Sequence, residues 1–185
     1  MAGNREYDKD RFENLVLYFT ERSQDDVGFG MVKLNKLLFR TDFEAYRLLG
    51  TSITGEEYKH QELGPVAAHL PSLLRRLAPD REDVVAVEEI PAGPFPRKVP
   101  TPTGRRTADT SLFGENELAV ADKTLEELKE YGGKSVSRWS HSASVGWRVH
   151  NSMNAKIPYS SALLSIRPLS DNAEAALRAR FESTV

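Results

Sequence analysis

The chain has 185 residues, a length that suits one well-packed domain. Hydrophobic residues make up 39% and charged residues 28%, a globular balance, and the formal net charge of −2 does not favour nucleic acid or an anionic membrane as a partner. The absence of cysteine excludes disulfides, thiolate zinc sites and cysteine nucleophiles, and no apolar run approaches the ~20 residues of a membrane span. Because the N-terminal segment is polar and charged, unlike a signal peptide, we expect a cytoplasmic protein with no membrane partner.

The first predicted helix follows Asp10, which we expect to be its N-cap. Its apolar residues Phe12, Leu15, Val16 and Phe19 recur at helical spacing and predict one buried face. This face should pack on one flank of the helix that comes next.

The most informative stretch runs from Met31 to Gly50 and has no internal glycine or proline, so it predicts a helix over about 31–49 that Gly50 ends. Two apolar flanks run along this helix, where an ordinary surface helix has one. We therefore expect a central helix that is covered on most sides. The remaining strip is charged, should contact water, and consists of Lys33, Lys36, Arg40, Glu44 and Arg47.

Two polar residues of the same helix, Asn35 and Asp42, lie seven positions apart and opposite the charged strip, so they should point inward. A buried carboxylate is costly unless it is paired or hydrogen-bonded. The prediction is that Asp42 has a fixed partner, either a backbone N–H group, Lys59 or His60. We interpret Asn35 and Asp42 as buried polar anchors of the fold.

After the central helix the sequence predicts short extended pieces up to Gly64, and Pro65 should begin a helix that Pro71 kinks or splits. The β-branched segment 84–90 predicts a strand. Segment 97–103 is either a second strand or a loop, and its prolines restrict it to the edge of a sheet.

The last third of the chain predicts a helix over 115–131 with an acidic outer face and a final helix over about 170–184. Between them we expect a short helix that Ser135 or Ser137 caps, followed by a second helical turn that ends near 150. The predicted fold class is therefore α+β and predominantly helical, with the central helix surrounded by helices and a small antiparallel sheet or hairpin. We expect a single domain over 1–185, with its core at about 12–150 and the final helix packed on that core.

Motifs for enzymatic chemistry are missing from the sequence. It contains no phosphate-binding or dinucleotide-binding glycine motif, and its four histidines lack the spacing of metal ligands, so we expect no cofactor and no metal. Ser140 and His141 are neighbours in sequence, which on a helix points them in different directions and is no sign of a catalytic dyad. We expect His141 to pack near Trp139 or Trp147.

Nucleic-acid binding is the main alternative that the residues themselves raise. The basic strip of the central helix could form a recognition helix, and arginine pairs at 75–76 and 105–106 add positive charge. However, Glu44 interrupts the strip, and both the acidic helix and the net charge make a DNA partner unlikely. The proline-rich segment 91–104 is either a polyproline ligand or a protected loop or edge strand.

Three segments, taken in order, resemble the SocA-like Panacea antitoxin domain family. The first segment, at 33–50, is KLNKLLFRTDFEAYRLLG and contains the pattern K-L-x-K-L-L. The second, at 62–66, is ELGPV and contains G-P-V. The third, at 127–150, contains a serine–histidine run followed by a tryptophan, with Ser140 where threonine is usual. The residues that match these family motifs are Lys33, Leu34, Lys36, Leu37, Leu38, Gly64, Pro65, Val66, Ser140, His141 and Trp147.

The resemblance implies a non-enzymatic antitoxin that neutralises a cognate protein toxin by direct binding, with no catalytic residue and no cofactor. Two alternatives stay open: an adaptor that delivers the toxin to a protease, and a DNA-binding regulator of its own operon. The expected partner-binding residues are the basic Arg97, Lys98, Arg105 and Arg106, whose charge would complement an acidic partner. An acidic helix that faces a basic partner is the alternative surface.

Overall fold

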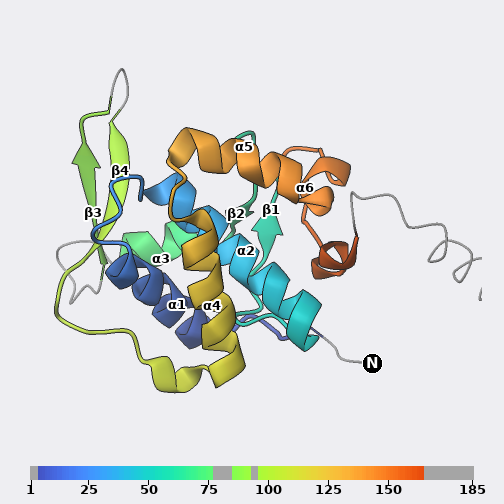
Figure 1. Ribbon diagram of the computed structural model, residues 1–185, viewed down its shortest axis with the longest axis horizontal. Helices are drawn as coiled ribbons and strands as arrows, with labels where there is room; N and C mark the ends of the chain where they lie inside the picture. Colours follow the sequence, from blue (N-terminus) through green and yellow to red (C-terminus); the bar gives the residue numbers. More distant parts are fainter. Residues whose placement is uncertain (1–3, 77–84, 93–95, 165–185) are drawn as a thin grey trace, which may run out of the picture.

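The computed structural model describes residues 4–76, 85–92 and 96–164 (Figure 1). Its elements are α1 (Lys9–Arg22), α2 (Met31–Leu49), β1 (Tyr58–Lys59), β2 (Val66–Ala67), α3 (Leu70–Arg76), β3 (Val85–Ile90), β4 (Arg97–Pro102), η1 (Thr110–Leu112), α4 (Glu115–Leu128), α5 (Gly133–Ala143), α6 (Val145–Val149) and η2 (Tyr159–Leu163). This arrangement confirms a predominantly helical α+β fold. The helix predicted over 170–184 lies outside the described residues.

Helix α2 runs through the middle of the molecule, with α1, α4, α5 and the β3–β4 hairpin around it (Figure 1). Leu34, Leu37 and Leu38 are fully buried on one flank, and Phe39 and Phe43 are buried on the other. Burial of both flanks confirms the central helix. It ends at Gly50, whose φ of +80° is favourable for glycine.

Helix α1 begins at Lys9, two residues earlier than its pattern predicts. Its N-cap is Asp8, whose side chain accepts hydrogen bonds from the backbone N–H groups of Asp10 and Arg11, so the prediction of Asp10 as the cap is wrong. The predicted apolar face is confirmed, because Phe12 and Phe19 are fully buried against the core that α2 shares.

The prediction of a helix that begins at Pro65 is wrong. Val66 and Ala67 instead form strand β2, which pairs antiparallel with Tyr58 and Lys59 of β1. Helix α3 begins only at Leu70, so Pro71 falls in its first turn, where its missing N–H leaves no helical hydrogen bond unmade. The extended pair places the turn between β1 and β2 beside α2.

Strands β3 and β4 form a separate antiparallel hairpin, from the pair Val85 and Pro102 to the pair Ile90 and Arg97. Both strands are confirmed, and a two-stranded ribbon leaves each strand one free edge, which is where the prolines of β4 can be accommodated. The N-terminal end of β4 lies against the loop before α2, because Gly30 is in close contact with Arg97 and Lys98.

Helices α4, α5 and α6 cover the other sides of α2. The first of these helices ends at Leu128, before the predicted stop at Gly132 and Gly133. These glycines instead begin the second helix: Gly132 is the N-cap of α5, and its N–H donates to the Ser135 hydroxyl. Helix α5 therefore begins at Gly133, and neither Ser135 nor Ser137 is its N-cap, contrary to the prediction. A short 3-10 turn, η2, then closes over the C-terminal half of α2.

Candidate functional site

The three motif segments meet at one place, which we call the motif junction: Lys36 on α2, Gly64 and Pro65 in the β1–β2 turn, and Ser140, His141 and Trp147 on α5 and α6. The Lys36 amine donates a hydrogen bond of 3.0 Å to the carbonyl oxygen of Pro65. The Ser137 hydroxyl, one turn before Ser140, donates to the carbonyl oxygen of Leu63 at 2.5 Å. The turn is thus held from two sides by helices that are far apart in sequence.

Gly64 occupies a position that only glycine fits. Its φ is +100°, a conformation that residues with a Cβ rarely adopt. A Cβ there would lie 2.4 Å from the Ser140 hydroxyl oxygen and 2.8 Å from Cε of Lys36. The glycine of the second motif is therefore required by close packing of the turn between α2 and α5.

Trp147 closes the junction on its other side. Its ring stacks between those of His60, at a centroid distance of 4.5 Å, and His141, at 3.9 Å with an interplanar angle of 2°. The indole N–H donates to the carbonyl oxygen of Gln61 at 3.1 Å. The predicted packing of His141 near a tryptophan is confirmed, and burial, followed by the nearby charges of Lys36 and His60, lowers the pKa of His141.

Lys36 itself is an unusual lysine, because its side chain is only 1% exposed. Burial lowers the pKa of its amine to about 7, since the surroundings disfavour the charged form. Lys33, also 1% exposed, is charge-paired instead: its amine contacts the Asp26 carboxylate at 2.5 Å and the carbonyl oxygens of Lys129 and Tyr131 at 2.8 Å each.

The prediction that the charged strip of α2 contacts water is therefore wrong over most of its length. Lys33, Lys36 and Glu44 are buried, and Arg40 and Arg47 are the members that reach solvent. The physical reason is that the surrounding turns and helix ends supply carbonyl groups and a carboxylate, which satisfy the buried lysines.

The two buried polar anchors are confirmed as buried. Asp42 is fully inaccessible and accepts hydrogen bonds from the backbone N–H groups of Ile53 and Thr54 and from the Thr54 hydroxyl. The hydroxyl group of Tyr58 also donates to it, and the Tyr159 hydroxyl, which donates to the carbonyl of Glu56, lies 3.4 Å away. Burial raises the pKa of the Asp42 carboxyl, while the Thr54 hydrogen bonds act in the opposite direction.

Of the partners predicted for Asp42, the backbone N–H group is right, whereas Lys59 and His60 are not the partners found. Asn35 lies closer to the junction, where its side-chain oxygen accepts from the backbone N–H of Ala67 and its amide donates to the carbonyl oxygen of Met31. It thereby attaches strand β2 to α2.

The sequence reasoning missed a second buried acid, Glu56, whose side chain is fully buried. Its Oε1 lies 2.9 Å from Nδ1 of His69, and burial raises the pKa of the carboxyl. The His69 ring stacks on Tyr7 at 4.1 Å. No local pattern indicates this pair, because Glu56 stands beside a second glutamate, Glu57, and His69 lies 13 positions further along the chain.

The four basic residues expected to bind a partner fall into two pairs. Arg97 and Lys98 lie on β4 beside the start of α2, where an Arg97 Nη donates to the carbonyl oxygen of Val27 at 2.6 Å. Arg105 and Arg106 lie in the loop after β4, where Arg106 forms an ion pair of 2.7 Å with Glu13 of α1. The fold thus separates the two pairs instead of forming one patch.

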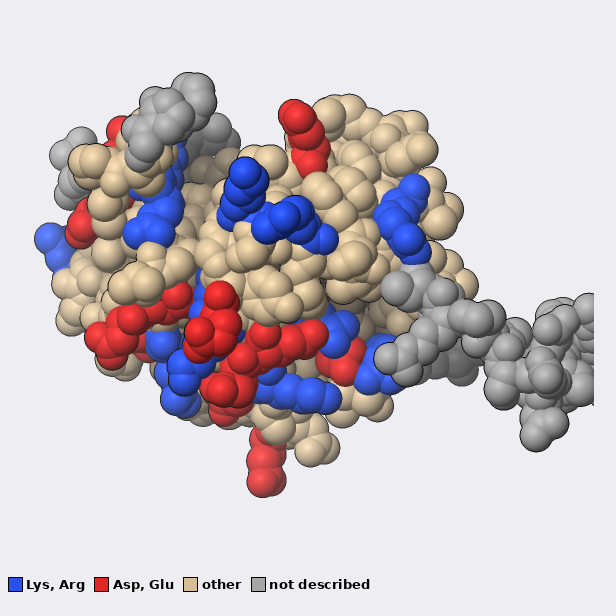
Figure 2. All heavy atoms as spheres, turned by 45° about the horizontal axis from the view of Figure 1, so that its top comes forward, with Lys and Arg blue, Asp and Glu red and all other residues tan. Residues whose placement is uncertain are grey.

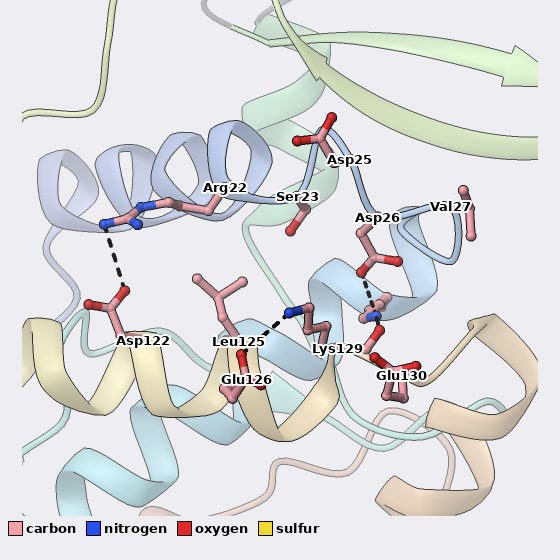
Figure 3. Close-up of a pocket in the computed structure, with 11 residues that line it drawn as sticks. Arg22, Ser23, Asp25, Asp26, Val27, Asp122, Leu125, Glu126, Lys129 and Glu130 are labelled. Carbon is pink, nitrogen blue, oxygen red and sulfur yellow. Dashed lines mark hydrogen bonds and ion pairs between the residues drawn. The ribbon is translucent and has the colours of Figure 1, made fainter.

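A cavity of about 660 Å³ lies between the end of α1 and α4 (Figure 3). It contains Asp25, Asp26, Asp122, Glu126 and Glu130 together with three basic side chains. Its charges are largely paired internally, as Asp26 with Lys33 at 2.5 Å, Glu126 with Lys129 at 3.8 Å and Asp122 with Arg22 at 3.9 Å. The acidic helix α4 therefore presents a charged, hollowed surface.

The described part of the chain has neither a cluster of metal ligands nor a helix that could span a membrane. Nowhere in residues 4–76, 85–92 and 96–164 do three or more histidines or carboxylates gather in a way that could hold a metal ion. Within the same ranges, every helix is too short or too polar to cross a membrane.

The fold and the junction define a small, mainly helical α+β domain in which the motif residues bind the chain's own turns to its central helix. The chain belongs to the antitoxin SocA-like, Panacea domain family, whose model matches residues 34–148. The matched region begins just inside α2 and ends in α6, so it includes every residue of the motif junction. No curated protein and no solved structure matches the chain significantly.

Proposed function

We propose that this protein is the antitoxin of a toxin–antitoxin pair and that it neutralises a protein toxin by binding it directly. The observation that carries the proposal is the match of the antitoxin family model to residues 34–148, which span the motif junction. The toxin is expected to be encoded beside this chain.

The chemistry of the junction supports a binding role. The Lys36 amine donates to the carbonyl of Pro65, the Ser140 hydroxyl donates to the carbonyl of Ser137, and the Trp147 indole donates to the carbonyl of Gln61. These groups are engaged in holding backbone turns. A rigid scaffold of this kind suits a protein that presents a preformed surface to a partner.

The experiment is co-expression of this chain with the product of the neighbouring reading frame. We expect that the neighbouring product alone stops growth, that this chain restores it, and that the two proteins co-purify at equal amounts of each. Growth arrest that this chain fails to relieve, together with no co-purification, would contradict the proposal.

The same strains distinguish direct blocking from delivery to a protease. If the chain acts by blocking, the toxin persists as a stable complex, and its half-life after translation is stopped does not shorten when the antitoxin is present. A shortened half-life that depends on a cellular protease would favour the adaptor role instead.

Regulation of the chain's own operon is the less favoured alternative. Lys33 and Lys36 would have to reach a DNA groove from α2, but both side chains are 1% exposed. Binding of the purified chain to its upstream DNA, with an affinity that falls steeply as salt increases, would revive this alternative.

A further inference from the structure

Two hollows adjoin at the first turn of α2, and together we call them the α2 groove. One, of about 380 Å³, lies between α2 and the β1–β2 turn, and the other, of about 280 Å³, lies between α2, the start of β4 and the start of α5. They share Met31 and Val32. The apolar residues that line them are Met31, Val32, Leu63, Val66 and Pro96.

The most exposed of these apolar side chains is held in a fixed position. Leu63 is 58% exposed, yet its carbonyl oxygen accepts from the Ser137 hydroxyl at 2.5 Å and the next residue, Gly64, donates to the carbonyl of Gln61 at 2.9 Å. On this fixed backbone, Leu63 extends the apolar lining that Met31, Val32 and Val66 give the hollow, and contiguous exposed apolar residues of this kind mark interaction surfaces. Little conformational entropy is then lost when a partner covers Leu63.

The charges around the α2 groove are unequal. Among the described residues that line its two hollows, the basic side chains are Lys33, Lys36, Arg97 and Lys98, and the acidic one is Glu62. Lys33 is neutralised by Asp26, and Lys36 is buried with its amine on the Pro65 carbonyl. Lys98 forms an exposed ion pair of 3.7 Å with Glu89, a type of contact that contributes little, so Arg97 and Lys98 supply the positive charge that an acidic partner can reach. Figure 2 shows basic side chains beside the hairpin and over α5, whereas the acidic ones gather mainly over α4.

Two features add to this positive character. Nε of Arg97 is buried and has no hydrogen-bond partner among the described residues, although the same guanidinium group holds the carbonyl of Val27. Helices α2 and α5 both begin at the groove, with glycine N-caps at Gly30 and Gly132. The N-terminal end of a helix carries partial positive charge, which stabilises a nearby carboxylate.

We propose that the α2 groove is the surface that binds the toxin, and that its occupant is a short acidic segment of the toxin that also carries apolar side chains. This inference rests on the proposed antitoxin function. The apolar side chains cover Leu63 and Met31, and a carboxylate of the segment pairs with Lys98 and Arg97 on β4. The basic pair on β4 thus binds the partner, whereas Arg105 and Arg106 do not.

The test measures the affinity of the purified chain for the toxin that co-expression identifies, with single variants and matched controls. Leu63→Ala removes the apolar contact, and Leu163→Ala is its control, because Leu163 is 63% exposed and lies on η2. Lys98→Glu reverses one exposed charge, and Arg105→Glu does the same in the loop after β4. Arg97 is left unchanged because it holds the loop before α2.

We expect Leu63→Ala and Lys98→Glu each to raise Kd by about tenfold or more, as truncation at an interface anchor does, while both controls stay within about twofold. Lys98→Glu should also weaken the salt dependence of association. Unfolding transitions at the wild-type temperature for all four variants will show that each is folded.

The outcomes separate the two proposals. If the wild-type chain does not bind the toxin, the antitoxin function is overturned and this inference with it. If the wild-type chain binds and both groove variants bind equally well, the groove inference alone is overturned. A loss of affinity in Glu126→Lys and Glu130→Lys, without loss in the groove variants, would place a basic partner segment at the acidic cavity of Figure 3 and also overturn it.

Discussion

Replacement of Gly64 by alanine tests whether the motif junction is as closely packed as its geometry indicates. A Cβ costs about 1–2 kcal/mol in a left-handed backbone conformation, and the φ of Gly64 is +100°. The new methyl group would also lie 2.4 Å from the Ser140 hydroxyl oxygen and 2.8 Å from Cε of Lys36. Overpacking of this kind costs about 1–3 kcal/mol, so Gly64→Ala should lower the free energy of unfolding by about 3 kcal/mol.

Gly104→Ala is the matched control. Its φ of +74° brings a comparable backbone strain, but nothing lies within 4 Å of the added Cβ, so it should cost only about 1 kcal/mol. Urea unfolding followed by circular dichroism gives both values, and equal slopes confirm that the unfolded states are comparable. Ser140→Ala in the Gly64→Ala background should restore part of the loss. If the two glycine variants differ by less than about 0.5 kcal/mol, the close packing inferred here is wrong.

Three further substitutions test the buried polar groups. Asp42→Ala leaves the N–H groups of Ile53 and Thr54 without their acceptor and should cost about 3–5 kcal/mol in urea unfolding, whereas Asp25→Ala on the exposed loop should cost less than about 0.5. Lys33→Ala leaves the Asp26 carboxylate unpaired and should cost about 3 kcal/mol, and a near-neutral result would mean that water replaces the amine. Lys36 has a folded-state pKa of about 7 against 10.5 for an exposed lysine, so between these values the unfolded chain binds the extra proton and stability rises with pH. Relative to Lys36→Met, the wild-type chain should therefore gain about 1 kcal/mol of unfolding free energy per pH unit above about pH 7, and parallel pH curves for the two would contradict the shift.

The central helix could be predicted because its evidence is local. Helical geometry alone decides which of the residues 31–49 share a face of the helix. It places Asn35 and Asp42 on one line and predicts that both face inward. The same geometry does not reveal what the rest of the chain brings to each face. Lys33 and Lys36 share a strip with Arg40, but carbonyl groups from the end of α4 and from Pro65 meet only the first two.

The start of the next element was missed for a related reason. Pro65 is a good first residue of a helix, but Val66 and Ala67 are held extended by pairing with Tyr58 and Lys59 and by a hydrogen bond from Ala67 to Asn35. Such partners are distant in sequence, so tertiary pairing overrides the local preference. At the candidate binding surface, the sequence shows that Arg97 and Lys98 are basic. Their separation from Arg105 and Arg106 could not be predicted, because it depends on the register of the hairpin.

The position of Tyr159 in the sequence affects when the chain can complete its fold during synthesis. Its hydroxyl donates to the carbonyl of Glu56 at 2.7 Å, and its ring packs on Phe43, so the centre of the molecule is completed by a residue beyond position 148, where the family match stops. A ribosome must therefore release nearly all of the described sequence before α2 is fully enclosed. We expect nascent chains that stop at about residue 150 to remain protease-sensitive, and a gene fragment cut at the family boundary to yield a poorly folded product.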